Sequence, residues 1–90
     1  MKPDAGHIVD SLGWVHYQRG EYEQAVTQLE RAVELLEVPD AVIYDHLGDA
    51  YARLNRIDKA REAWQKALET DPETTGVAEK LRSHSLNSAL

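Results

Sequence analysis

The chain lacks cysteine, is short of basic residues and has no long apolar run. Without cysteine there are no disulfides, thiolate zinc sites or cysteine nucleophiles. Ten Lys and Arg against sixteen Asp and Glu give a formal net charge of -6, the wrong sign for a domain that follows nucleic-acid phosphates. No run approaches the roughly 20 apolar residues of a membrane span, and no signal-peptide pattern opens the chain. We therefore expect a soluble domain that binds neither nucleic acid nor membrane and carries no cofactor.

Proline is also scarce, and its three positions mark helix boundaries. Between them, apolar residues recur at intervals of three and four, which predicts helices over residues 4–18, 21–36, 40–54 and 58–70. Gly20 ends the first helix, Asp40 caps the third, and Asn55 tolerates the left-handed conformation that a tight corner requires. Asp71 and Pro72 are predicted to cap and start a fifth, weaker helix.

The chain repeats itself at an offset of 35 residues. Matching identities fall on both helices of each pair, which indicates a duplicated helix pair. They are Ile8 with Ile43, Asp10 with Asp45, Leu12 with Leu47, Gly13 with Gly48, Ala25 with Ala60, Ala32 with Ala67 and Glu34 with Glu69.

Small residues at matching positions predict that the two helices of each pair cross closely. Gly13, Ala25 and Ala32 supply small side chains in the first pair, and Gly48, Ala60 and Ala67 do so in the second. Large neighbours are expected to fill the wedge beside each crossing, Leu12 with Leu29 and Leu47 with Trp64, each contributing roughly 1.5 to 3 kcal/mol by burial.

These residues resemble the tetratricopeptide repeat, which has a period of about 34 residues. The second unit matches its pattern at Tyr44, Leu47, Gly48, Tyr51, Ala60, Trp64, Ala67 and Pro72, and the first at Val9, Leu12, Gly13, His16, Gly20, Tyr22, Ala25, Leu29 and Ala32. The first unit departs at His16, where tyrosine is usual, and at Glu37, where proline is expected.

The resemblance implies an all-α, right-handed superhelix of antiparallel helix pairs with about five helices. It divides a single domain over residues 1–90 into repeat one (about 5–38), repeat two (about 40–72), a capping helix (about 73–84) and a frayed tail (85–90). Arg82 stands where a small residue is needed to pack a following helix, so we expect the array to end there. An unrelated five-helix bundle is the alternative.

The resemblance also implies that the first helices of successive repeats line a concave groove for a partner peptide or helix. Carried over by register, the groove residues are His7, Asp10, Ser11, Trp14, Tyr17, Gln18, Val42, Asp45, His46, Asp49, Ala52 and Arg53. Acidic and aromatic side chains together suit a partner segment that carries Lys or Arg. The alternative for the aspartates is an ordinary solvated helix face, whereas Trp14 is a less usual surface residue.

Other functions fit the sequence less well. Groove positions that hold lysine, asparagine and arginine in members binding acidic chaperone tails carry Asp10, Trp14 and His46, so we do not expect that ligand. Asp45 and His46 point about 100 degrees apart on a helix, which disfavours a metal site. Ser11 has no base and acid beside it, and we expect no enzyme. A second hypothesis is self-association through Ile8, Leu12 and Val15 on the open face of the first helix.

Overall fold

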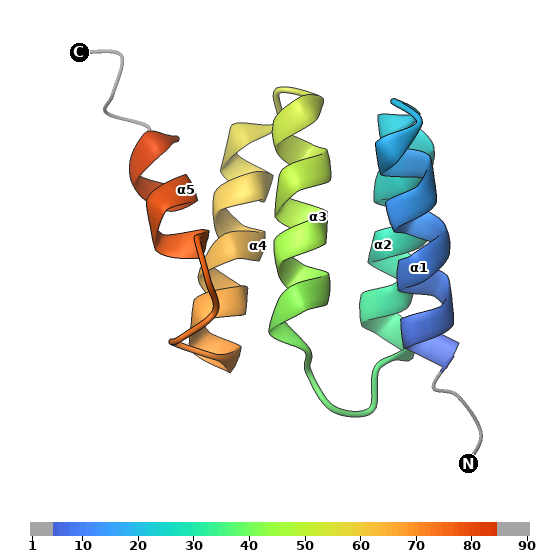
Figure 1. Ribbon diagram of the computed structural model, residues 1–90, viewed down its shortest axis with the longest axis horizontal. Coiled ribbons are helices and arrows are strands. Elements are labelled where there is room, and N and C mark those ends of the chain that lie inside the picture. The colour runs from blue at the N-terminus through green and yellow to red at the C-terminus, as the bar shows by residue number, and fades with distance from the viewer. Residues whose placement is uncertain (1–4, 85–90) are drawn as a thin grey trace.

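Five helices and no strand make up residues 5–84, the part of the chain that the computed structural model describes. They are α1 (Ala5–Gln18), α2 (Tyr22–Leu35), α3 (Ala41–Arg53), α4 (Ile57–Thr70) and α5 (Val77–Ser83). α1 pairs with α2, α3 pairs with α4, α2 packs on α3, and α5 packs on α4 (Figure 1). The predicted all-α stack of helix pairs is confirmed, while the predicted frayed tail lies outside the described residues.

The first four helices begin and end where the local sequence indicates. Gly20 has a φ of 80° and Asn55 a φ of 60°, so both adopt the left-handed conformation that ends a helix. The Asp40 carboxylate accepts a hydrogen bond of 2.9 Å from the Val42 backbone N–H and caps α3. Helix ends set by such short-range chemistry can be predicted without knowledge of the tertiary structure.

The predicted start of the fifth helix at Pro72 was wrong. Asp71 instead organises a turn, because its carboxylate accepts from the Glu73 N–H at 3.0 Å and its carbonyl from the Thr74 N–H at 3.0 Å. Gly76, with a φ of 82°, precedes the first residue of α5, Val77. Because a left-handed residue cannot continue a right-handed helix, α5 is shorter than predicted. Pro72 is exposed in this turn, so it marks the end of α4 and adds little packing.

The glycines lie at the close crossings that the repeat predicts. A Cβ added to Gly13 would lie 2.8 Å from the Leu29 Cγ, and one added to Gly48 would overlap the indole Nε1 and Cδ1 of Trp64. The four alanines of the two crossings, Ala25, Ala32, Ala60 and Ala67, have no exposed surface. Leu29 of the first pair is also buried. In the second pair both Leu47 and Trp64 are buried, so this pair packs as predicted.

Leu12 departs from its predicted packing role, since 47% of its surface is exposed. Ile8 and Val15 on the same helix are 55% and 51% exposed. Their counterparts one repeat later, Ile43, Leu47 and Ala50, are 1%, 7% and 0% exposed. The difference arises because α2 packs against α3, whereas no described helix covers this side of α1.

Tyr51 of α3 joins the second repeat to α2 of the first repeat. Its ring is buried, and its hydroxyl donates a short hydrogen bond to the Glu30 carboxylate on α2. His16 occupies the matching position in repeat one, is partly buried, and forms a 2.8 Å hydrogen bond with Glu21 instead. The histidine therefore fastens the corner between α1 and α2.

Gly48→Ala tests the close crossing in the second pair. In an exposed helix this change stabilises by about 1 kcal/mol, but here the new methyl group would overlap the buried Trp64 ring. We expect a net loss of about 1 to 3 kcal/mol, typical of overpacking, measured by urea unfolding. Ala78→Gly, at an exposed position of α5, is the control for helix propensity alone. A Gly48→Ala variant more stable than the wild type would contradict the crossing.

Candidate functional site

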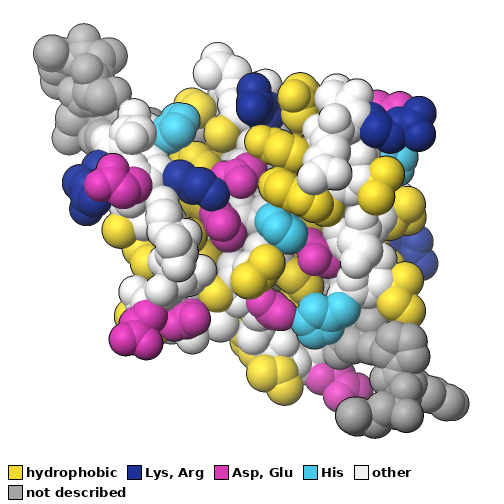
Figure 2. Space-filling view, in the orientation of Figure 1, with side chains coloured by type: hydrophobic (Ala, Val, Ile, Leu, Met, Phe, Trp, Pro, Cys, Tyr) yellow, Lys and Arg dark blue, Asp and Glu magenta, His cyan; other side chains and the backbone are white. Residues whose placement is uncertain are grey.

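One side of the molecule is formed by α1, α3 and α5, which lie nearer the viewer than α2 and α4 in Figure 1. We call it the first-helix face. Seen from the same direction, acidic and histidine side chains gather with hydrophobic ones over its middle (Figure 2). A pocket of about 400 Å³ opens on this face and is lined by Tyr17, Asp49, Ala52, Arg53, Trp64, Lys80 and His84. Most of the groove residues predicted from register lie in or beside this region.

A stack of three rings connects α1 to α3. The Trp14 ring lies parallel to Tyr17, with 4.5 Å between ring centroids, and stacks on His46 at 4.0 Å. Arg53 extends the stack: its Nε donates to the Tyr17 hydroxyl at 3.2 Å, and its guanidinium lies 5.8 Å from the Tyr17 ring and 5.7 Å from Tyr22. The face thus holds a rigid aromatic centre.

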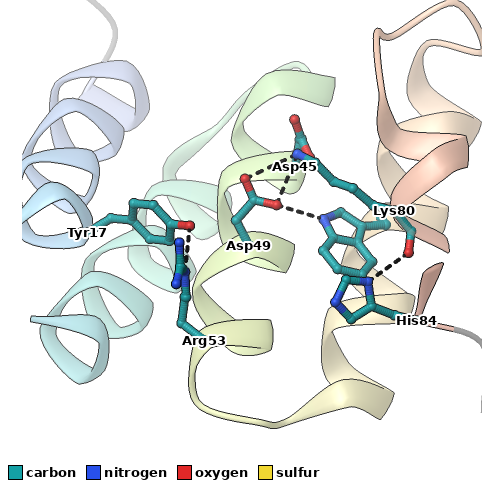
Figure 3. Close-up of polar contacts among 7 residues, drawn as sticks. Tyr17, Asp45, Asp49, Arg53, Lys80 and His84 are labelled. Carbon is teal, nitrogen blue, oxygen red and sulfur yellow. Dashed lines mark hydrogen bonds and ion pairs between the residues drawn. The ribbon is translucent and has the colours of Figure 1, made fainter. Parts of the chain in front are cut away.

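Each aspartate of the predicted acidic groove is already paired with a base of the same chain. The His46 Nδ1 lies 2.8 Å from an Asp10 carboxylate oxygen. The Lys80 ammonium lies 2.7 Å from Asp45 and 3.0 Å from Asp49 (Figure 3). These pairs tie successive first helices together, so the face has less uncompensated negative charge than the sequence predicts.

Partial burial shifts the pKa values in the Lys80 cluster. Burial raises the pKa of Asp49, against the hydrogen bonds from Lys80 and from the Trp64 indole N–H. Burial by itself would lower the pKa of Lys80, but the hydrogen bonds from its ammonium to Asp45 and Asp49 raise this pKa overall. Lys80 is therefore charged at neutral pH and bridges two carboxylates with its single positive charge.

The remaining predicted groove residues lie apart from this cluster. His7 pairs with Asp40 at 2.7 Å beside the start of α3. The Ser11 hydroxyl donates to the backbone carbonyl of His7, one turn earlier, at 3.1 Å. Gln18 is exposed at the end of α1, and Val42 is 52% exposed on α3.

Sequence reasoning missed Lys80, Tyr22 and Asp40 as participants in this face. The offset of 35 residues that relates Asp10 to Asp45 leads next to Lys80, so the register itself contained the signal. Tyr22 follows directly on the corner that Gly20 makes, which brings the ring back beside Tyr17 at 5.4 Å. Within residues 5–84, no three His, Asp or Glu side chains are placed to hold a metal ion. Likewise, none of the described helices has the length and apolar composition to cross a bilayer.

The repeat period, the crossing glycines and the stacked helix pairs agree with comparisons to known families. Two sequence models of the tetratricopeptide repeat match the chain, one over residues 8–38 and the other over residues 41–74. The chain belongs to the tetratricopeptide repeat family. Tetratricopeptide repeats generally mediate contacts between proteins and are typically not catalytic, so a scaffold or protein-binding role follows at that level.

One similar protein is the protein O-mannosyl-transferase tmtc2 of Xenopus laevis. It is 26% identical over 65 residues, which is 70% of this chain and 8% of that protein. The chain therefore corresponds to a small part of the relative.

The Asp40 cap gives a test that depends on pH. Burial opposes ionisation, but hydrogen bonds from His7 and the Val42 N–H lower the pKa of Asp40 overall. Because the folded-state pKa is below the ordinary 3.8, the carboxylate stabilises the fold at neutral pH, and this contribution is lost as the pH falls through the folded-state pKa. Asp40→Ala should cost about 1 kcal/mol near neutral pH, the usual value of such a cap.

Urea unfolding near neutral pH and again well below pH 3.8 would measure this contribution. Asp40→Asn should lower the free energy of unfolding less than Asp40→Ala does, because the amide oxygen can still accept the hydrogen bond from the Val42 N–H. Asp58→Asn, on the exposed start of α4, is the control. The stability difference between the wild type and Asp40→Asn should shrink as the pH falls. A difference that grows on acidification would contradict the stabilising role of the Asp40 carboxylate.

Proposed function

We propose that the first-helix face binds a segment of a partner protein that carries a basic side chain. The observation that best supports this proposal is the environment of Trp14. Its ring is held between Tyr17 and His46, yet its indole N–H donates to no described residue and is not fully buried. A rigid aromatic side chain with an available donor is the kind of residue that anchors protein interfaces.

The carboxylates beside Trp14 support the basic character of the partner. Only one oxygen of Asp10 bonds to His46, and only one oxygen of Asp45 bonds to Lys80, so the second oxygen of each accepts no hydrogen bond from a described residue. An incoming ammonium or guanidinium group can donate to these oxygens. The net charge of -6 favours approach of a basic segment, with a salt-dependent association rate.

Trp14→Ala tests this proposal. Peptides selected on the wild-type protein from a random phage-displayed library should be enriched in Lys and Arg and should lose affinity for the variant. Removing an anchoring tryptophan typically costs 2 kcal/mol or more, which is about thirtyfold in Kd. Trp14→Phe keeps a ring in the stack but removes the indole N–H, so its affinity should lie between the two.

Circular dichroism would show whether both variants keep their helical content. Peptides that bind Trp14→Ala as tightly as the wild type would show that Trp14 is not the anchor. Selection of peptides enriched in Asp and Glu would contradict the basic partner.

A second candidate function is self-association through the outer side of α1. Ile8, Leu12 and Val15 form an exposed apolar stripe, and the matching stripe on α3 is buried under α2. At the other end of the described stack, α5 packs on α4.

Ile8→Glu distinguishes the two candidates. A charge in the middle of a self-associating apolar stripe should weaken a dimer by tenfold or more, because the carboxylate loses its hydration without a partner. Sedimentation equilibrium over a range of concentrations measures this. Val38→Glu, at the 73% exposed position between α2 and α3, is the matched control. A wild-type protein that stays monomeric at high concentration would remove this candidate.

A further inference from the structure

Lys80 occupies a distinctive position on the first-helix face. Asp10, Asp45 and Lys80 are successive members of one register position, 35 residues apart. In α1 and α3 that position presents an acid to the face, and in α5 it presents a base. The ammonium lies 2.7 Å from Asp45 and 3.0 Å from Asp49, whose side chains are 19% and 17% exposed. A basic group of α5 is therefore bound by two acids of α3, the first helix of the preceding repeat.

The docking of α5 on α4 has other sources than Lys80. Val77 is fully buried, and Arg61 of α4 donates to the backbone carbonyls of Leu81 at 2.7 Å and His84 at 3.0 Å. The His84 ring lies 5.0 Å from the Trp64 ring. Because these contacts hold the backbone of α5, the long Lys80 side chain can leave the carboxylates without the helix leaving α4.

The pocket lies directly beside this ion pair. Asp49 and Lys80 lie on one side of it and Tyr17 with Arg53 on the other (Figure 3), and Ala52 also lines it. Its volume of about 400 Å³ leaves room for an incoming side chain next to the Asp49 carboxylate. Arg53 lies over the Tyr17 and Tyr22 rings and is close enough to Asp49 for their charges to interact.

The charges favour a cation here. Asp45 and Asp49 share one ammonium in a partly buried place where electrostatic interactions are stronger than in water, so these three groups together carry one negative charge. The Arg53 guanidinium, which also lines the pocket, offsets part of that charge from the opposite side while its Nε donates to the Tyr17 hydroxyl. A second cation entering from the pocket side would complete the compensation, or would replace Lys80.

We propose that Asp45 and Asp49 form the subsite for the partner's Lys or Arg side chain, and that Lys80 occupies this subsite in the free protein. This inference rests on the proposed function and adds a named subsite and an internal competitor to it. A partner must compete with a tethered ammonium, which lowers its apparent affinity by the fraction of molecules in which the subsite is open. Lys80 thus raises the intrinsic affinity that a basic ligand needs in order to bind.

The test uses N-acetyl-L-argininamide as a probe and the indole N–H signal of Trp64 in nitrogen–proton NMR spectra as the readout. This N–H donates to Asp49, whereas Trp14 reports on the ring stack. Lys80→Gln should bind the probe about tenfold more tightly than the wild type, because the competing ammonium is gone. Lys80→Arg, which keeps the charge, should resemble the wild type.

Adding Asp45→Asn and Asp49→Asn to Lys80→Gln should abolish the shift of the Trp64 signal, and N-acetyl-L-glutaminamide should cause none in any variant. Equal affinity of the wild type and Lys80→Gln for the probe would overturn the proposal, as would binding that survives both Asp→Asn changes. Lys80→Met is the second variant if Lys80→Gln loses helical content. Since no protein partner or Trp14 variant is involved, failure here leaves the protein-binding face to be judged by Trp14→Ala alone.

Discussion

The fold depends on the absence of a side chain at two helix crossings. At Gly48 the indole ring of Trp64 fills the place where a Cβ would be, and at Gly13 the Leu29 side chain comes nearly as close. This approach lets each pair bury its alanines completely, in a chain whose length makes a single core only marginally sufficient. It also directs the opposite sides of α1 and α3 outward together, which creates the first-helix face.

That face is held together by the same kind of groups that a partner would use. The ring stack of Trp14 and His46 and the His46 to Asp10 hydrogen bond join α1 to α3, and the Lys80 ion pairs join α3 to α5. A binding surface built from such contacts is already ordered before a partner arrives, which reduces the entropy lost on binding. Under the proposed function, a basic ligand would compete with the chain's own bases, which would couple selectivity to stability at these positions.

Several parts of the fold could be predicted because they depend on residues close in sequence. The left-handed corners at Gly20 and Asn55 and the Asp40 cap are local, and the register of 35 residues located both crossings. The start of α5 was predicted wrongly because Asp71 and Pro72 are as suitable for a turn as for a helix start. Leu12 was predicted both to fill the wedge beside Leu29 and to lie on the open face of the first helix, and its exposure fits the second prediction, because burial requires a neighbouring helix and not only an apolar residue.

The sequence by itself determined the helix pairs, their close crossings and the side chains available to the first-helix face. Only the tertiary structure decided which of those side chains meet. His46 lies 36 residues from Asp10, and Lys80 lies 31 and 35 residues from Asp49 and Asp45, so their pairing follows from how successive helices stack. Periodicity specifies the face on which a side chain lies, whereas its partner depends on the spacing and rotation of the next helix. An acidic groove in the sequence is therefore, in the folded protein, a set of ion pairs around a ring stack.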